Sequence, residues 1–221
     1  MPAVKPFDLS VYVITDARLS RGRTNVEVVT EAMAGGATCI QLREKGLSTR
    51  DYFHLAEELR ELTMEKGVTF IVNDHLDIAL AVGADGVHLG QEDLPASVAR
   101  RMIPPEMILG VTARNVHQAK QFQEAGATYL GVGAVYFTGT KNNTGSPIGL
   151  QGLAEICRSV KIPVVGVGGI NLERAGPVIA AGASGVALVS AVASAPNIAR
   201  AVEEIAHAVD QARLHQRSSN K

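Results

Sequence analysis

The sequence predicts an α/β protein folded as a single (β/α)8 TIM barrel, and three observations support this fold class. The chain has 221 residues, a length that suits one closed barrel and can bury a large core. Hydrophobic residues make up 46% of it, in short apolar runs that alternate with amphipathic segments. A Gly-Ala pair ends four of the amphipathic segments, which indicates a repeated strand–helix unit. A doubly wound open sheet is the alternative, but eight evenly spaced units favour closure.

Each of these four Gly-Ala pairs ends an amphipathic segment and precedes a short apolar run. Glycine at such a position is typical of a helix C-terminal cap, which lets the chain turn into a strand. The four pairs are Gly36-Ala37, Gly83-Ala84, Gly126-Ala127 and Gly182-Ala183. The strands predicted after them cover residues 39–42, 86–89, 129–132 and 185–189.

Four further apolar runs lie between these strands and bring the predicted number to eight. Near-continuous hydrophobic runs are typical of parallel strands that are buried on both faces. These runs cover residues 11–15, 69–72, 108–111 and 163–167. Helices are expected in the intervals, among them residues 51–66, 116–124 and 198–213. We expect one domain over residues 1–221, with a barrel core over about 10–212 and a frayed polar tail over 213–221.

Charge and composition limit the partners. Lys and Arg number 21 against 22 Asp and Glu, and aromatic residues make up only 4%. A near-neutral chain with few stacking side chains predicts no nucleic-acid partner, so any bound anion needs a local cluster of donors. We expect small-molecule substrates instead, and the sequence is compatible with a homo-oligomer.

The sequence also predicts a cytoplasmic protein without a membrane partner. No apolar run approaches the ~20 residues that span a bilayer. Residues 1–8 lack the basic-then-apolar pattern of a signal peptide. Cys39 and Cys157 lie in apolar stretches and are interpreted as two buried free thiols in a reducing compartment.

The second predicted strand runs into a polar segment that suits a diphosphate. Alternation along a strand places Gln41, Arg43 and Lys45 on one face, with Gln41 and Arg43 pointing into the barrel. Arg offers a bidentate fork and Lys a point charge for phosphate oxygens. The alternative is that these strand-end charges only face water.

Two carboxylates follow the third and fourth strands. Asp74 comes after Asn73, and Asp93 closes the segment after the fourth strand. Adjacent strand ends would bring both near one cation, and Mg²⁺ bound to a diphosphate needs few protein oxygens. Asp74 could also cap a helix over residues 76–82. His88, without a second His or Cys at metal spacing, is interpreted as a packed, hydrogen-bonded residue.

The later strands indicate a lid and a second phosphate site. Residues 137–147 form a long polar loop with glycines, a composition typical of a lid, and Lys141 on it could complete an anion site on closure. Gly168-Gly169 and Val189-Ser190 end the seventh and eighth strands. Backbone amides at these ends form a recurrent phosphate site in barrels.

These residues resemble the thiamine phosphate synthase family over nearly the whole chain, from Tyr12 to Ala191. The most specific matches are residues 41–45, 72–74, 83–93, 138–141, 168–170 and 189–191. The resemblance implies a transferase of thiamine biosynthesis on a TIM barrel. It would join 4-amino-2-methyl-5-hydroxymethylpyrimidine diphosphate to 4-methyl-5-hydroxyethylthiazole phosphate, releasing diphosphate through a dissociative, carbocation-like substitution.

The resemblance also implies roles for individual residues. Arg43, Lys45 and Lys141 would be catalytic, and Mg²⁺ would lie on Asp74 and Asp93. The pyrimidine diphosphate would contact Gln41, Leu42, Arg43, Glu44, Lys45, Asn73, Thr112 and Lys141. The thiazole phosphate would contact Thr138, Gly139, Thr140, Gly169, Val189 and Ser190.

Two departures from the family pattern stand out. Thr112 replaces a usual Ser, and Arg114 stands where a His often follows it. Residues 134–137 lack the two usual prolines, which predicts a more flexible start to the lid.

Three alternative functions compete with the synthase. A thiazole tautomerase of the same fold would use a His where this chain has Arg114, and a non-catalytic phosphate-binding barrel would have lost diphosphate ligands. An isomerase would need an acid–base pair, but Glu44 and Glu92 have no evident partner.

Overall fold

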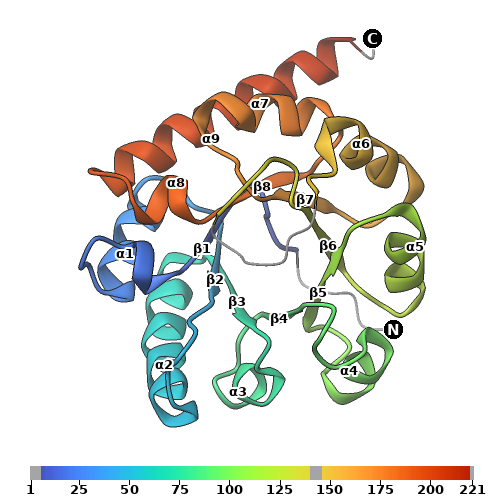
Figure 1. Ribbon diagram of the computed structural model, residues 1–221. Coiled ribbons are helices and arrows are strands. Elements are labelled where there is room, and N and C mark those ends of the chain that lie inside the picture. Colours follow the sequence, from blue (N-terminus) through green and yellow to red (C-terminus); the bar gives the residue numbers. More distant parts are fainter. Residues whose placement is uncertain (1–5, 140–145, 220–221) are drawn as a thin grey trace.

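Residues 6–139 and 146–219 are described by a computed structural model; Thr140 and Lys141 lie outside these ranges. Within them, eight parallel strands pair in sequence order and close into a barrel, which confirms the predicted fold class (Figure 1). The strands are β1 (Val11–Ile14), β2 (Cys39–Leu42), β3 (Thr69–Asn73), β4 (Gly86–Leu89), β5 (Ile108–Ala113), β6 (Tyr129–Gly133), β7 (Val164–Val167) and β8 (Gly185–Leu188).

Helices surround this ring of strands (Figure 1). They are the 3-10 helix η1 (Ala17–Leu19), α1 (Asn25–Ala34), α2 (Thr49–Lys66), α3 (Leu76–Ala81), α4 (Ala96–Met102), α5 (Val116–Glu124), α6 (Gly149–Ser159), α7 (Leu172–Ala180), α8 (Ser190–Ala193) and α9 (Ile198–Ser219). Among the described helices, none is both long and apolar enough to cross a bilayer.

The strands bury both faces, as their near-continuous apolar sequences predict. One face packs against the helices in the larger core, for example through Ile40 and Leu42 of β2. The other face fills the barrel interior, where Cys39 lies with Tyr12 and Tyr129. Alternate residues of one strand therefore belong to different cores, and inward positions such as Gln41 lead up to the carboxyl ends of the strands.

The recurring Gly-Ala pairs cap four helices in the same way. After α1, Gly36 has φ +97°, and its amide donates to the Met33 carbonyl (3.1 Å). The Ala37 amide then donates to the Ala32 carbonyl (3.0 Å), which completes a Schellman motif. The equivalent bonds recur at Gly83, Gly126 and Gly182, all with positive φ. The predicted helix-to-strand turns are therefore confirmed.

The C-terminal segment differs from the prediction. Residues 213–219 continue α9 instead of fraying, and α9 lies beside α7 (Figure 1). Two polar side chains explain this, because they bond to carbonyls of neighbouring elements. Arg213 Nη2 donates to the Ser184 carbonyl, and Gln216 Nε2 donates to the Ile179 carbonyl (2.6 Å).

Both cysteines are free thiols, as predicted, but only Cys39 is fully buried. Cys157 is half-buried on α6. Burial raises the pKa of the Cys39 thiol well above its usual range and that of Cys157 to about 11. Both thiols are therefore poorly reactive at neutral pH.

Candidate active site

The end of β1 holds Arg43 in place at the end of β2. The Arg43 amide donates to Thr15 Oγ1 (2.9 Å), and its guanidinium Nη1 lies 3.6 Å from Asp16 Oδ2. Arg18 binds the same carboxylate through Nε (2.9 Å) and Nη2 (2.6 Å). The hydrogen bonds from Arg18 lower the pKa of Asp16, and nearby Arg43 adds to the effect. Arg43 is thus a buried cation with a fixed counter-ion, at the edge where predicted ligands would bind.

The residues around Arg43 in the sequence differ in burial and in the direction of their side chains. Gln41 points into the barrel as predicted and is buried. The strand ends at Leu42, so the alternation does not extend to Lys45, which is exposed. The Leu42 side chain packs in the outer core, and the Glu44 carboxylate accepts the Ala17 amide (3.0 and 3.1 Å). The structure therefore brings together Gln41 and Arg43, and it turns the Leu42 side chain away from them.

Asp74 follows β3 in an unusual backbone conformation. Its φ is +63°, a region that non-glycine residues rarely adopt and that occurs preferentially at functional sites. The Asp74 amide donates to the His88 carbonyl of β4 (2.9 Å). His75, without a side-chain cap bond, is the N-cap of α3, so Asp74 does not have the capping role considered from sequence. Asn73, buried at the end of β3, is tied through its carbonyl to the Tyr52 hydroxyl (3.3 Å).

Asp93 lies on the neighbouring turn after β4. The residue is half-buried, and its Oδ2 accepts the Gly90 amide (2.6 Å), a bond that closes the turn. Among the described residues, no group of three or more His, Cys, Asp or Glu could form a metal site. Two carboxylates after paired strands β3 and β4 nevertheless fit Mg²⁺, which takes its other ligands from water and phosphate oxygens.

Gly168 and Gly169 are required by the packing of the β7 turn. A Cβ on Gly168 would lie 2.7 Å from Ala134 Cβ, and one on Gly169 would lie 2.5 Å from the Phe137 carbonyl. Both glycines also have positive φ, +95° and +65°. The sequence predicts a role for them in phosphate approach, and the structure shows in addition that residues 134–137 pack directly against them.

The start of the loop that was predicted to be a lid is anchored, although its lack of prolines predicted flexibility. The amides of Val135 and Tyr136 donate to carbonyls of the β7 turn (2.9 and 3.1 Å). The amides of Ile148 and Gly149 return to the carbonyls of Ala134 and Val135 (2.9 and 3.1 Å). Arg174 stacks over the Tyr136 ring at 4.6 Å from its centroid.

The residues predicted for the second phosphate flank this region. Thr138 is half-buried and Gly139 exposed at the last described part of the loop before residue 140. Val189 is the N-cap of α8, and Ser190 is its exposed first residue, so amides of a helix start lie at the end of β8. This matches the helix start expected there from sequence.

The barrel interior holds two buried phenols, Tyr12 and Tyr129, that sequence reasoning missed. The hydroxyl of Tyr12 contacts both Gln41 Nε2 (2.6 Å) and the Tyr129 hydroxyl (2.8 Å). His88 bonds to Tyr129 and Thr112, which confirms that it is a packed, hydrogen-bonded residue. The available signal was the period of two, which puts Tyr12 on the inward face of its strand.

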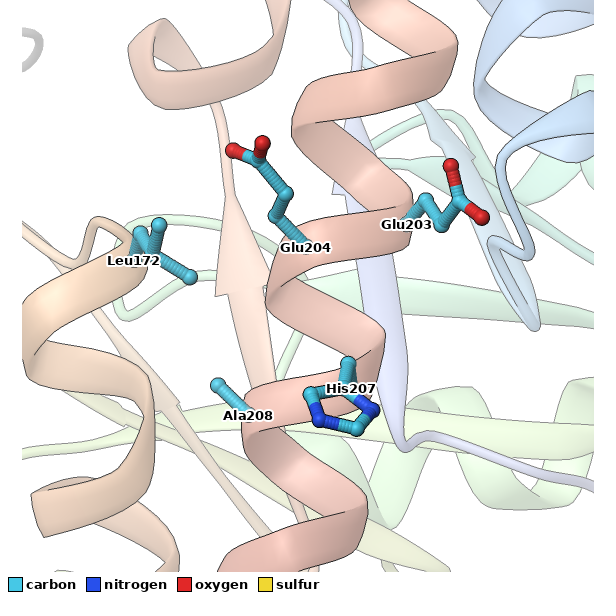
Figure 2. Close-up of a pocket in the computed structure, with 5 residues that line it drawn as sticks. All are labelled: Leu172, Glu203, Glu204, His207 and Ala208. Atoms are coloured by element: carbon cyan, nitrogen blue, oxygen red, sulfur yellow. The ribbon is translucent and has the colours of Figure 1, made fainter.

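Two surface hollows can be compared with the predicted site residues at the strand ends: one lies away from them and the other lies at their edge. A hollow of about 470 Å³ lies on the outer helical layer between α7 and α9, lined by Leu172, Glu203, Glu204, His207 and Ala208 (Figure 2). Its described lining contains none of the predicted site residues. A second, of about 340 Å³, includes Gly90, Asp93 and Val111, so it reaches the turn that carries one predicted metal ligand.

The fold and the strand-end cluster define a class: a (β/α)8-barrel enzyme with its site at the carboxyl ends of the strands. A family model described as thiamine monophosphate synthase matches residues 11–192. The chain therefore belongs to the thiamine monophosphate synthase family, whose members are transferases, as its motifs predicted.

Individual relatives agree over almost the full length. The thiamine-phosphate synthase of Moorella thermoacetica is 54% identical over 203 residues, 92% of this chain and 97% of the relative. That of Roseiflexus sp. (strain RS-1) is 50% identical over 208 residues, 94% of this chain and 88% of the relative. A solved thiamine phosphate pyrophosphorylase from Pyrococcus furiosus has a TM-score of 0.86 and 44% identity, and the match covers 92% of this chain and 96% of that one.

Proposed function

We propose that this protein couples 4-amino-2-methyl-5-hydroxymethylpyrimidine diphosphate with 4-methyl-5-hydroxyethylthiazole phosphate and releases thiamine phosphate and diphosphate. Family membership supports the reaction class. The observation that carries the proposal is the arrangement at the ends of β1 to β4. There, the buried guanidinium of Arg43 and the carboxylates Asp74 and Asp93 lie at successive strand ends, which suits a metal-bound diphosphate.

The pyrimidine diphosphate would bind on this side of the barrel. Gln41 and Thr112 would contact the ring, and Arg43 and Asn73 would hold the diphosphate with Lys45. Asp16 supports this role for Arg43, because a guanidinium with a fixed counter-ion needs little reorganisation when an anion arrives. Lys141 is proposed to join the site from the lid; it lies outside the described residues.

Asp74 and Asp93 would hold Mg²⁺, which when bound would neutralise charge on the diphosphate. The bond from the Gly90 amide uses Asp93 Oδ2, and the other carboxylate oxygen, Oδ1, is the one we assign to the metal. Asp74 has a left-handed backbone conformation, and His75, not Asp74, is the N-cap residue of α3.

The thiazole phosphate would bind on the opposite side, after β6, β7 and β8. Thr138, Gly139 and Thr140 of the lid loop would face Gly169 and the start of α8 at Val189 and Ser190. The anchored loop start supports this, because the backbone bonds from Val135 and Tyr136 hold the loop directly over the β7 turn.

The proposed chemistry needs no general base, because the attacking thiazole nitrogen carries no proton. Departure of diphosphate would leave a pyrimidine-methyl cation, which the nitrogen captures. Arg43 and Lys45 would stabilise the charge that grows on the leaving group. The two phosphate sites would hold the reacting carbon and nitrogen at attack distance, and the lid would exclude water.

The direct test is diphosphate release by the purified protein, with each precursor alone, with both, and with or without Mg²⁺. We expect release only when both precursors and the metal are present, in a one-to-one ratio with thiamine phosphate. A folded protein that releases no diphosphate under any of these conditions would exclude the coupling reaction.

Asp93→Asn tests the metal assignment. Asparagine keeps an oxygen that can accept the Gly90 amide, so the turn is retained while the negative charge is lost. We expect kcat/KM to fall about 100-fold or more, with a higher Mg²⁺ requirement, because several kcal/mol of charge stabilisation would be lost. Asp210→Asn removes an exposed carboxylate on α9 and serves as the matched control. Equal kinetics in the two variants would remove Asp93 from the site.

We also propose a cytoplasmic location, on the ground that both cysteines are free thiols. Fractionation of the source cells checks it: recovery of the protein outside the cytoplasm would contradict this part of the proposal.

A further inference from the structure

Five side chains form one hydrogen-bonded chain across the barrel interior. Gln41 Nε2 donates to the Tyr12 hydroxyl (2.6 Å), which contacts the Tyr129 hydroxyl (2.8 Å). Tyr129 contacts His88 Nδ1 (2.8 Å), and His88 Nε2 contacts Thr112 Oγ1 (2.9 Å). The members come from β2, β1, β6, β4 and β5, so the chain links distant strands. Its two ends, Gln41 and Thr112, are the side chains proposed to contact the pyrimidine.

Glycines make the space for this chain. A Cβ on Gly110 would lie 2.2 Å from the Tyr129 ring, and one on Gly131 would lie 2.9 Å from His88 Cε1. Gly110 and Gly131 belong to strands β5 and β6, next to the rings that they accommodate. The barrel interior is therefore shaped to hold these two rings in contact.

Both phenols of the chain stay protonated. Tyr12 and Tyr129 are at most 2% exposed, and burial raises the pKa of each well above its usual range. A buried hydroxyl proton without an acceptor is costly, so each phenol must donate to a neighbour. Each phenol therefore accepts one hydrogen bond from one side of the chain and donates one to the other side.

This requirement makes all the links run the same way, and the Gln41 donation sets that direction. Because Gln41 donates to Tyr12, the Tyr12 proton goes to Tyr129 and the Tyr129 proton goes to His88 Nδ1. The proton of neutral His88 is then on Nε2 and is donated to Thr112 Oγ1. Reversing one link alone would bring two protons face to face. Reversing the whole chain would require the Gln41 carboxamide to turn over and give up the donation to Tyr12 that the structure shows.

The direction sets what each end offers a ligand. The Thr112 oxygen accepts from His88, so its own proton is available for donation outward. The Gln41 nitrogen is engaged by Tyr12, which leaves the carboxamide oxygen as an acceptor. Within residues 6–139 and 146–219, no donor contacts that oxygen. One end of the chain thus accepts a hydrogen bond and the other end donates one.

We propose that Tyr12, Tyr129 and His88 are positioning residues that fix this polarity and so select an amino-substituted nitrogen heterocycle. An amino group would donate to Gln41 Oε1, and a ring nitrogen would accept from Thr112. In the oxo analogue a carbonyl replaces the amino group, so two oxygens would face each other at Gln41. The inference rests on the proposed function, because it takes the pyrimidine to lie between Gln41 and Thr112.

The test compares the amino-pyrimidine diphosphate with its oxo analogue in wild type and in Tyr129→Phe. Phenylalanine keeps the ring but interrupts the chain at its centre, so Gln41 and Thr112 can reverse independently. We expect the wild type to prefer the amino compound by about 100-fold or more in kcat/KM. In the variant we expect the amino-to-oxo ratio of kcat/KM to be about tenfold lower, because a factor of this size corresponds to the loss of one uncharged hydrogen bond.

Two further variants separate polarity from stability. Tyr12→Phe interrupts the same chain, so it should lower the preference as Tyr129→Phe does, and the double variant should lower it no further. Tyr52→Phe removes another buried phenol, which donates to the Leu42 carbonyl (2.7 Å) outside the chain. It should lower Tm by a similar amount and leave the amino-to-oxo ratio unchanged.

Binding is measured beside turnover, by calorimetry of each pyrimidine diphosphate with Mg²⁺. Folded Tyr129→Phe and Tyr12→Phe variants that keep the wild-type ratio in both measurements would overturn the inference. A wild type that binds with the expected preference but does not couple the substrates would contradict the proposed function alone. Failure of the wild type to bind either diphosphate would overturn both.

Discussion

Asp16 lies between two guanidinium groups at the end of β1, and it connects the chemistry of Arg43 to the fold. Its side chain is 2% exposed and that of Arg43 is 7% exposed, while Arg18, at 61%, lies at the surface. A buried cation without a partner is strongly unfavourable, so the carboxylate both permits the burial of Arg43 and directs its guanidinium.

Asp16→Asn should therefore impair the reaction through Arg43. The amide keeps a hydrogen-bond acceptor but leaves the Arg43 charge uncompensated. We expect kcat/KM to fall on the order of 100-fold, mainly through kcat, because a small displacement of a charge-stabilising group has effects of this size. Steady-state kinetics check the prediction.

Asp8→Asn is the control for this variant. Asp8 is an exposed carboxylate just before β1, bonded to Ser10 at the opposite end of the strand. We expect its kinetics to match the wild type. If both variants lose activity equally, the effect belongs to β1 as an element and Asp16 does not position Arg43.

At the scale of elements, the sequence predicted the middle of strands and helices better than their ends. The bounds of β2, β4 and α5 agree with the prediction, because Gly-Ala caps or an N-cap residue mark them. By contrast, β5 extends through Thr112 and Ala113, and α9 continues to Ser219. Pairing with β6 sets the end of β5, and side-chain bonds to α7 and to Ser184 before β8 set the end of α9. Such tertiary contacts leave no local pattern.

Gly168→Ala tests the close contact at the end of β7. The new Cβ would meet Ala134, in addition to the cost of a φ of +95°. We expect a loss in the free energy of unfolding of about 1–2 kcal/mol from the backbone and a further ~1–3 kcal/mol from the clash. Urea unfolding at fixed pH measures it.

Gly46→Ala is a matched control, since Gly46 also has φ +95° but no heavy atom within 4 Å of a built Cβ. It should show the backbone cost alone. Equal losses in the two variants would mean that the lid loop does not press on the β7 turn.

For the whole molecule, the number of predicted strands was enough to predict a closed barrel. The polar residues that end the strands were enough to predict which edge of the barrel would carry the site. Gln41 and Arg43 were placed inward correctly because alternation holds within β2 and one residue past it. The hydrogen-bonded chain through Tyr12 and Tyr129 could not be predicted. Five strands contribute to it, and their relative heights depend on the stagger of the closed barrel.

The buried phenols also make the stability of the whole barrel sensitive to alkali. The pKa values of Tyr12 and Tyr129 are raised by burial above the value of about 10 expected in the unfolded chain. The folded state therefore holds these protons more tightly, so stability is complete below about pH 10 and falls as the pH rises further.

Unfolding free energies measured from about pH 8 to about pH 11 test this predicted loss of stability. The Tyr12→Phe/Tyr129→Phe double variant should be less stable at neutral pH but should lose less on alkalinisation. An unchanged slope would mean that other groups, such as the buried Cys39 thiol, account for the alkaline loss.

The most direct measurement of the central claim is a crystal structure of the protein with Mg²⁺, diphosphate and thiamine phosphate. We expect the metal at about 2.0–2.1 Å from oxygens of Asp74 and Asp93, with diphosphate on Arg43 and the product phosphate at the start of α8. Diphosphate bound elsewhere, for instance in the hollow between α7 and α9, with both carboxylates away from the metal, would contradict the account.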